Sequence, residues 1–236
     1  MNKYAAALLA GSAILASSTA TARDLNVEIT NLTNGLYFTP LLVAAHDRDT
    51  DLFEPGSKAG AHLQAMAEGG DIAGLISDVE FAGGRYAANP AEGLLAPGMT
   101  AYAELEVGGH RTAHLSVTAM ILPTNDGFVG LDGLQIPTKA GTYTYYLHAY
   151  DAGTEANDEI VNGGGAPGTP GIPADPGGNS GVGGTGVLST EHNTAVHIHR
   201  GVIGDTDPEA GASDLDSRIH RWNGPVARLV LDVSSR

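Results

Sequence analysis

The chain of 236 residues contains no cysteine, few basic side chains and few aromatic ones. Without cysteine it has no disulfide and no thiolate for nucleophilic catalysis or zinc binding, so its stability must come from a packed core or from bound metal. Beyond the first 22 residues it has no long apolar run, and we therefore expect no membrane insertion of the mature chain.

Basic residues are scarce relative to acidic ones. Removing Lys3 with the N-terminal segment leaves 11 basic side chains against 27 acidic ones, a formal charge of −16. Nucleic acid and anionic membrane surfaces both require basic protein surface, so neither is an expected partner. Such acidity suits a calcium-rich or saline exterior, and it also simply keeps an exported protein soluble.

The first 22 residues have the pattern of a secretory signal peptide. Lys3 supplies a positive charge, the apolar run AAALLAGSAILA follows, and Ala20-Thr21-Ala22 fits the small-x-small cleavage rule. We predict cleavage after Ala22 and a secreted or periplasmic protein. The alternative, a short membrane anchor, is less consistent with an apolar run too short to span a bilayer comfortably.

Alternation of apolar and polar residues predicts β-strands through most of the remaining chain. Pro40 indicates an edge or a bulge, and Gly108-Gly109 predicts the tight turn of a hairpin. Many strands with Gly/Pro turns and little helix predict an all-β antiparallel sandwich. Strands are expected over residues 25–31, 36–45, 99–107, 112–122, 142–150, 194–199 and 225–233.

Two segments depart from this pattern. Residues 57–68 are rich in alanine with apolar positions near helical spacing, Ser57 is a candidate cap, and residues 71–81 read as short helix or irregular chain. These segments are too short to form a core of their own, so they predict a helical insertion in the β domain.

Of the 24 residues from Gly163 to Gly186, 11 are Gly and four are Pro. We expect a flexible surface loop within one domain spanning residues 23–236, with a domain linker as the alternative.

Acidic residues gather at two turns that flank a predicted strand. Asp126 precedes the sequence FVGL, whereas Asp151 and Glu155 follow TYYLHAY, with Gly153 between them allowing the chain to turn back. Converging carboxylates repel one another unless a cation offsets their charge, and oxygen ligands of this kind suit Ca²⁺. The alternative is a pair of solvated polar turns, since Asp and Gly favour turns in any case.

His197 and His199 form a His-x-His pair within a predicted strand, whose period of two places both on one face. This spacing predicts Zn²⁺ or Cu²⁺ binding if a third ligand joins, such as His192, His220 or an acidic side chain. The alternative is two partly buried histidines hydrogen-bonded to loops. Nucleophilic catalysis has little support, because the chain has no G-x-S-x-G motif and no phosphate-binding loop with lysine.

The two acidic turns also carry a family resemblance. The order N-D-G-F-V-G-L-D-G-L, then an aromatic strand, then Y-D-A-G-T-E resembles the spondin N-terminal domain, in which an S-P-D-W-F-V-G-type segment precedes a W-D-A-G-T-D-type loop. The similarity is strongest over Leu122–Glu155 and weaker at VEITNLT and VHIHRGVIGD. Two departures stand out: Gly127 replaces the tryptophan, and Glu155 replaces the last aspartate.

This resemblance implies a C2-like antiparallel β-sandwich that binds Ca²⁺ through Asp126, Asp151 and Glu155. It implies no catalytic residue and a non-enzymatic role in binding or adhesion, with an extracellular protein or glycan as partner. A His-based metalloprotein or hydrolase that uses His197 and His199 is the alternative function. A metal-free structural envelope protein is a third.

Overall fold

The structure, a computed structural model, describes residues 22–178, 181–207 and 209–234. The predicted signal peptide therefore lies outside the described residues except for Ala22. The elements in chain order are β1 (Arg23–Asn31), β2 (Tyr37–Phe38), β3 (Leu42–His46), α1 (Ala61–Gly69), α2 (Ala73–Phe81), β4 (Arg85–Ala88), β5 (Thr100–Val107), a 3₁₀ turn (His110–Thr112), β6 (His114–Leu122), β7 (Gly127–Gln135), β8 (Gly141–Asp151), β9 (His197–Ile198) and β10 (Ala227–Val233).

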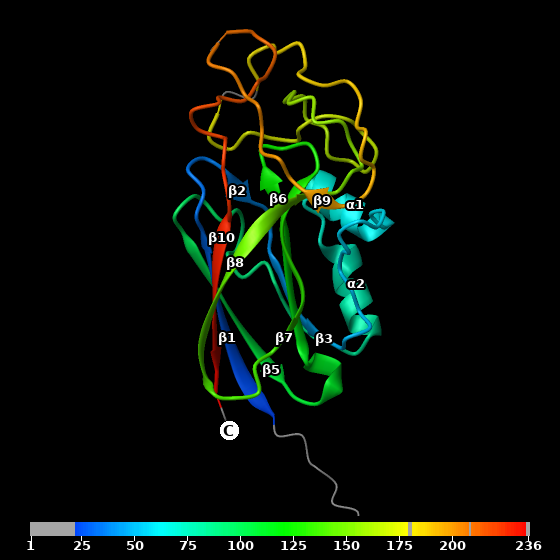
Figure 1. The fold of residues 1–236 in the computed structure, drawn as a ribbon, viewed down its shortest axis with the longest axis vertical. Helices are drawn as coiled ribbons and strands as arrows, with labels where there is room; N and C mark the ends of the chain where they lie inside the picture. The colour runs from blue at the N-terminus through cyan, green and yellow to red at the C-terminus, as the bar shows by residue number, and fades with distance from the viewer. Residues whose placement is uncertain (1–21, 179–180, 208, 235–236) are drawn as a thin grey trace, which may run out of the picture.

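The strands run in the order β4-β3-β6-β7-β8-β10-β1-β5, and each of these neighbours is antiparallel to the next. Strand β8 belongs to both halves of this path. Its first part, residues 141–147, pairs with β10, and its last part, residues 148–151, pairs with β7. The long, bent β8 therefore joins two sheets that lie face to face (Figure 1). The predicted all-β antiparallel sandwich is confirmed.

The burial patterns of the strands follow from the layers that cover them. β1, β5 and β10 alternate buried and more exposed residues, because only one face of their sheet is covered. β6 is buried along almost its whole length. Its Val117 and Ile121 pack into the core between the sheets, whereas its Met120 packs into a second core beneath α1 and α2. The two helices thus form a third layer, as Figure 1 shows.

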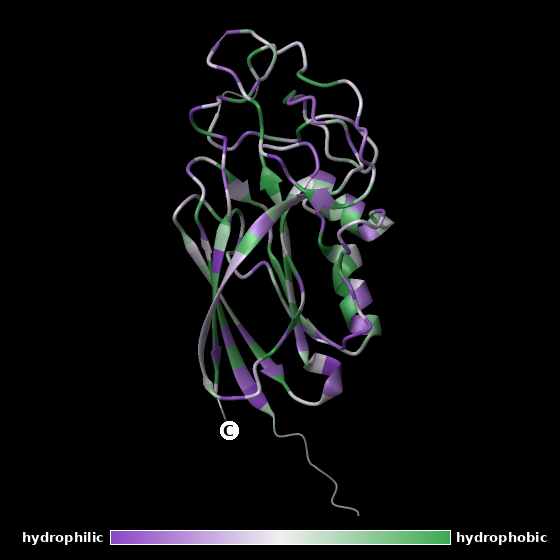
Figure 2. Ribbon diagram, in the orientation of Figure 1, coloured by the Kyte–Doolittle hydropathy of each residue, from purple (hydrophilic) through white to green (hydrophobic). Residues whose placement is uncertain are grey.

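Long loops gather at one end of the sandwich, opposite the end where β1 begins (Figure 1). They come from the segments between β8 and β9 and between β9 and β10. Their mixed hydropathy in Figure 2 contrasts with the apolar interior of the strands. One small apolar cluster nevertheless forms among them, from the buried side chains of Ile172, Val202 and Leu215. Ile172 belongs to the Gly163–Gly186 segment that the sequence predicted as a surface loop, yet it is fully buried.

Three local predictions were wrong. The strand ending at Val107 does not form a hairpin with β6, because it pairs with β1 while the 3₁₀ turn carries the chain across to the other sheet. Helix α1 begins at Ala61 without a side-chain cap, and the Ser57 hydroxyl instead donates to Glu54. The strand expected over residues 194–199 is reduced to the two residues of β9. In the described part of the chain, no helix has the length and apolar character needed to cross a membrane.

Candidate functional site

The two acidic turns meet at the loop end of the sandwich. Asp126 ends the turn between β6 and β7, and Asp151 is the last residue of β8. The antiparallel register of β7 and β8 pairs Gly127 with Asp151, so the strands themselves bring the two aspartates together. Thr124 fixes the first turn: its hydroxyl donates to the carbonyl of Ile121 and accepts from the N–H of Gly127.

Asp126 is fully buried, with 0% of its surface exposed. Its Oδ2 atom accepts hydrogen bonds from the Thr154 N–H at 2.7 Å, the Glu155 N–H at 3.1 Å and the Thr154 hydroxyl at 3.1 Å. These bonds tie the loop after β8 to the turn before β7. Its Oδ1 atom is also buried, yet no described residue hydrogen-bonds to it.

Asp151 is buried beside Asp126 and has a different set of neighbours. Its Oδ1 accepts from the Gly153 N–H at 2.8 Å, and its Oδ2 accepts from the side-chain amide of Asn157 at 2.7 Å. The Nε2 atom of His197 lies 3.7 Å from Oδ2. Gly153 has a φ of +69°, and a Cβ there would lie 2.8 Å from the carbonyl oxygen of Ala195, so this tight loop requires glycine.

Glu155 completes the group of three predicted ligands and is only 5% exposed. Its Oε2 accepts from the Gly171 N–H at 3.0 Å and from the Asn125 amide at 3.4 Å. Its Oε1 is buried, and nothing in the described chain hydrogen-bonds to it. Two of the three predicted side chains therefore present a buried carboxylate oxygen that lacks a partner.

Burial dominates the electrostatics of this cluster. It raises the pKa of Asp126 to about 7, with the negative charge of Asp151 as the next cause. Burial also raises the pKa of Glu155 to about 7, with further contributions from the charges of Glu68 and Asp126. The pKa of Asp151 is raised as well, again chiefly by burial. At neutral pH the cluster thus holds negative charge at a free-energy cost that a nearby cation would reduce.

The donor set fits a hard cation, since it consists of carboxylate oxygens. The side-chain positions do not form a finished metal centre. Within the described residues, no group of three or more His, Asp or Glu side chains is arranged to hold a metal ion. The structure brings together the predicted side chains of Asp126, Asp151 and Glu155. Each of them has an oxygen that accepts a hydrogen bond from a loop N–H group.

The two histidines of the predicted pair have different partners in the structure. The Nδ1 of His197 donates to the carbonyl of Ala195 at 2.8 Å, and its Nε2 faces Asp151. His199 is buried against Trp222, with their ring centroids 4.9 Å apart. His220 lies elsewhere, with its Nε2 3.7 Å from Asp175. The three histidines therefore have three different neighbourhoods.

Several buried polar residues around the cluster were not identified from the sequence. Glu68, at the end of α1, accepts from the Gly168 N–H and contributes to the raised pKa of Glu155. Asn157 donates to Asp151, and Glu159 accepts from the backbone of Ile203 and Gly204. Only the local turn composition of Asn157 and Glu159 gave any signal, because the partners of Glu68 and Glu159 lie in loops distant in sequence.

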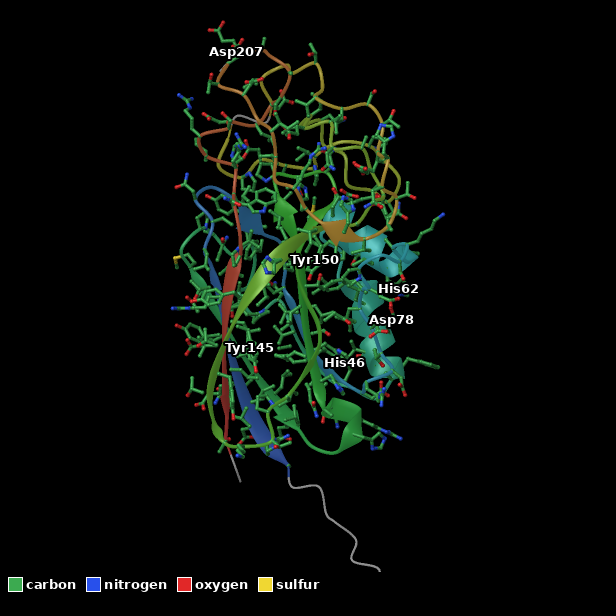
Figure 3. The ribbon with its side chains drawn as sticks, in the orientation of Figure 1. His46, His62, Asp78, Tyr145, Tyr150 and Asp207 are labelled. Atoms are coloured by element: carbon green, nitrogen blue, oxygen red, sulfur yellow. The ribbon has the colours of Figure 1, made fainter. Side chains whose placement is uncertain are left out.

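An aromatic group supports the strands beneath the cluster. The rings of Phe53, Phe128 and Tyr150 pack together with centroid distances of 4.9 to 5.6 Å. Tyr150, labelled in Figure 3, precedes Asp151 at the end of β8. Gly130 gives the Phe53 ring its space, because a Cβ at this position would lie 2.6 Å from that ring. The F-V-G part of the motif thus serves packing directly below the carboxylates.

Comparison with protein families gives a match over the first part of the domain. Residues 30–160 match the family model described as Spondin_N. The matched region includes both acidic turns and the strands between them, and it covers more than half of the chain. Among curated proteins, no match was found.

Proposed function

The chain belongs to the spondin N-terminal domain family, and on this premise we propose that it is an exported, calcium-binding recognition module. Domains of this family are typically extracellular, of a binding or adhesion type, and generally non-enzymatic. The proposal for this chain adds three specific points: cleavage of the signal peptide after Ala22, Ca²⁺ bound at the acidic turns, and an extracellular protein or glycan as partner.

The observation that carries the calcium proposal is the pair of buried carboxylate oxygens without a partner, Asp126 Oδ1 and Glu155 Oε1. Leaving a buried acceptor unsatisfied costs about 1–3 kcal/mol, and more when the group is charged. Two such atoms in one cluster, together with the charge of Asp151, indicate a site that a bound cation would stabilise. Their oxygens are the ligand type that Ca²⁺ prefers over softer metals.

Asp126, Asp151 and Glu155 are the proposed side-chain ligands, with backbone carbonyls and waters completing the coordination. When bound, Ca²⁺ supplies the positive charge that offsets the repulsion among these carboxylates. Asp126 already ties the Thr154–Glu155 loop to its own turn through backbone hydrogen bonds. Neutralising the cluster would strengthen this connection and hold the surrounding loops in one arrangement for a partner to recognise.

Calcium-dependent stability tests the proposal. Binding to the folded state alone raises stability by about 2.7 kcal/mol when the free ligand reaches 100 times its dissociation constant. We expect the unfolding temperature of the mature chain, residues 23–236, to rise with Ca²⁺ and to fall again when a chelator is added. The rise should be largely lost in Asp126→Asn and Asp151→Asn.

Asp49→Asn is the matched control, because this aspartate lies in an exposed loop with its side chain 87% exposed. This variant should respond to Ca²⁺ as the wild type does. Equal responses in Asp49→Asn and Asp126→Asn would show that calcium acts through general surface charge. Superimposable unfolding curves with Ca²⁺ and with chelator would remove calcium from the function altogether.

A further inference from the structure

A second feature, separate from the three carboxylates, is a small hollow between the end of β8, β9 and the turn that leads into β10. Its volume is about 160 Å³. Since a water molecule occupies about 30 Å³ in the liquid, the hollow has room for roughly five waters or one small ring. The described residues that line it are His148, Ala149, Ile198, His199, Arg200, Trp222, Asn223 and Gly224.

The charge of this lining differs from that of the whole protein. The chain carries 27 acidic side chains, yet none of the described lining residues is acidic. Arg200 brings a permanent positive charge, and its exposed side chain makes no ion pair among the described residues. His148 adds an exposed imidazole. A local absence of carboxylates around an unpaired guanidinium favours an anionic ligand.

His199 is part of the lining and lies beside Trp222. Its Nδ1 accepts a hydrogen bond from the Gly201 N–H at 3.0 Å, so the proton of the neutral ring is on Nε2. This Nε2–H group is buried, and no described residue accepts from it. Since the Nε2 atom is buried, it does not face the hollow, and a ligand there would contact the ring of His199 rather than this donor.

The remaining lining residues suggest which kind of anion fits. Trp222 is half-buried and offers an aromatic ring beside His199, with centroids 4.9 Å apart. Asn223 offers an amide that can donate to and accept from hydroxyl groups. An aromatic ring, an amide and one guanidinium group around a small concave site suit a ligand with an apolar face, hydroxyl groups and one negative group.

We propose that this hollow binds the carboxylate-bearing sugar unit of an acidic saccharide. In this arrangement Arg200 pairs with the carboxylate, the Asn223 amide hydrogen-bonds to a hydroxyl group, and Trp222 packs against the sugar ring. The proposal does not depend on calcium, because none of the three predicted calcium ligands lines the hollow.

Trp222 provides a direct assay because it is the only tryptophan of the chain. Its fluorescence would be titrated with D-glucuronate, D-glucose and acetate, each in excess Ca²⁺ and again with chelator. We expect a saturable change with glucuronate under both conditions. Glucose lacks the carboxylate and acetate lacks the ring, so each should bind at least tenfold more weakly.

Variants connect the fluorescence change to the hollow. Arg200→Gln should weaken glucuronate binding at least tenfold, and Asn223→Ala should weaken it by a smaller factor. Arg221→Gln is the matched control, since this arginine is adjacent to Trp222 in sequence but does not line the hollow, and it should stay within twofold of the wild type.

Specific results would overturn the proposal. They are the absence of a saturable change with glucuronate, equal affinities for glucuronate and glucose or acetate, or equal weakening by Arg200→Gln and Arg221→Gln. The Arg200 and Asn223 variants change exposed side chains, so a loss of affinity in them does not come from unfolding. Loss of the calcium response with intact glucuronate binding would refute the calcium site alone.

Discussion

Replacing Asp126 by asparagine in the calcium-free protein should change stability in a pH-dependent manner. Burial and the neighbouring Asp151 raise the pKa of Asp126 to about 7 in the folded state, against an ordinary value of 3.8. The folded protein therefore holds this proton more tightly than the unfolded chain does. Stability must fall as the pH rises through 7, because the folded state must then ionise a buried carboxyl group while the unfolded state is already ionised.

The magnitude follows from the titration. Between pH 6 and pH 8, a group with a folded pKa of about 7 changes the free energy of unfolding by about 1.4 kcal/mol relative to an already ionised reference. Asparagine has no such titration. We therefore expect the stability of Asp126→Asn relative to wild type to increase by about 1.4 kcal/mol from pH 6 to pH 8. For a domain of this size that is a shift of about 3–6 °C in unfolding temperature.

The comparison with the variant is essential because other groups titrate in the same range. Burial lowers the pKa of His199 to about 3, and this shift acts in the opposite direction, making the protein less stable as the pH falls below about 6.5. The difference between wild type and variant cancels this contribution. Urea unfolding at pH 6 and pH 8 with chelator present measures it, and Asp49→Asn should follow the wild-type profile. Parallel pH profiles for wild type and Asp126→Asn would refute the reasoning.

Three further predictions concern the packing around the site. Ile172→Ala should lower the free energy of unfolding by about 2–5 kcal/mol in urea, because Ile172 is fully buried. Ile203→Ala changes a more exposed side chain, and an equal loss of stability in the two variants would contradict this prediction. Gly153→Ala should lower the free energy of unfolding by about 1–3 kcal/mol or more, measured by thermal unfolding. Gly168→Ala is the control and should cost clearly less, because Gly168 has a similar positive φ but open space around it. Gly130→Ala should cost about 1–3 kcal/mol by displacing a phenylalanine ring, and an unchanged near-ultraviolet circular dichroism spectrum would contradict this.

Much of the fold was predictable from periodicity. The alternating residues of β1, β5 and β10 follow from one covered face, and the observed bounds lie within two residues of those expected. Partner choice was not predictable in the same way. The turn at Gly108-Gly109 looked like a hairpin, but β5 pairs with β1, some 75 residues earlier in the chain. Such pairing depends on long-range contacts that local turn composition does not encode.

The candidate site was likewise predictable only in part. Asp126 and Asp151 were expected to meet because they lie at the ends of neighbouring strands, and the register confirms their proximity. The two histidines of the His-x-His pair have different surroundings, since β9 ends at Ile198 and His199 is buried beside Trp222. The contribution of Glu68 had no sequence signal, since only the folded loops bring α1 to the cluster.

The long Gly/Pro-rich segment from Gly163 to Gly186 makes contacts that its composition did not predict. Its glycines suggested a solvated loop, yet its backbone N–H groups at Gly168 and Gly171 bond to buried carboxylates of Glu68 and Glu155. Glycine allows this close approach of the backbone to the carboxylates. Low sequence complexity therefore does not exclude a defined place in the candidate site.

Calcium binding measured by isothermal titration calorimetry tests the central claim most directly. At pH 8 the mature chain should bind one Ca²⁺ at the acidic turns, more tightly than at pH 6, because protons compete for the buried carboxylates. Asp126→Asn should weaken binding at least tenfold, whereas Asp49→Asn should not change it. Absence of binding to the wild type, or equal affinity in Asp126→Asn, would contradict the assignment of Asp126, Asp151 and Glu155 as a calcium site.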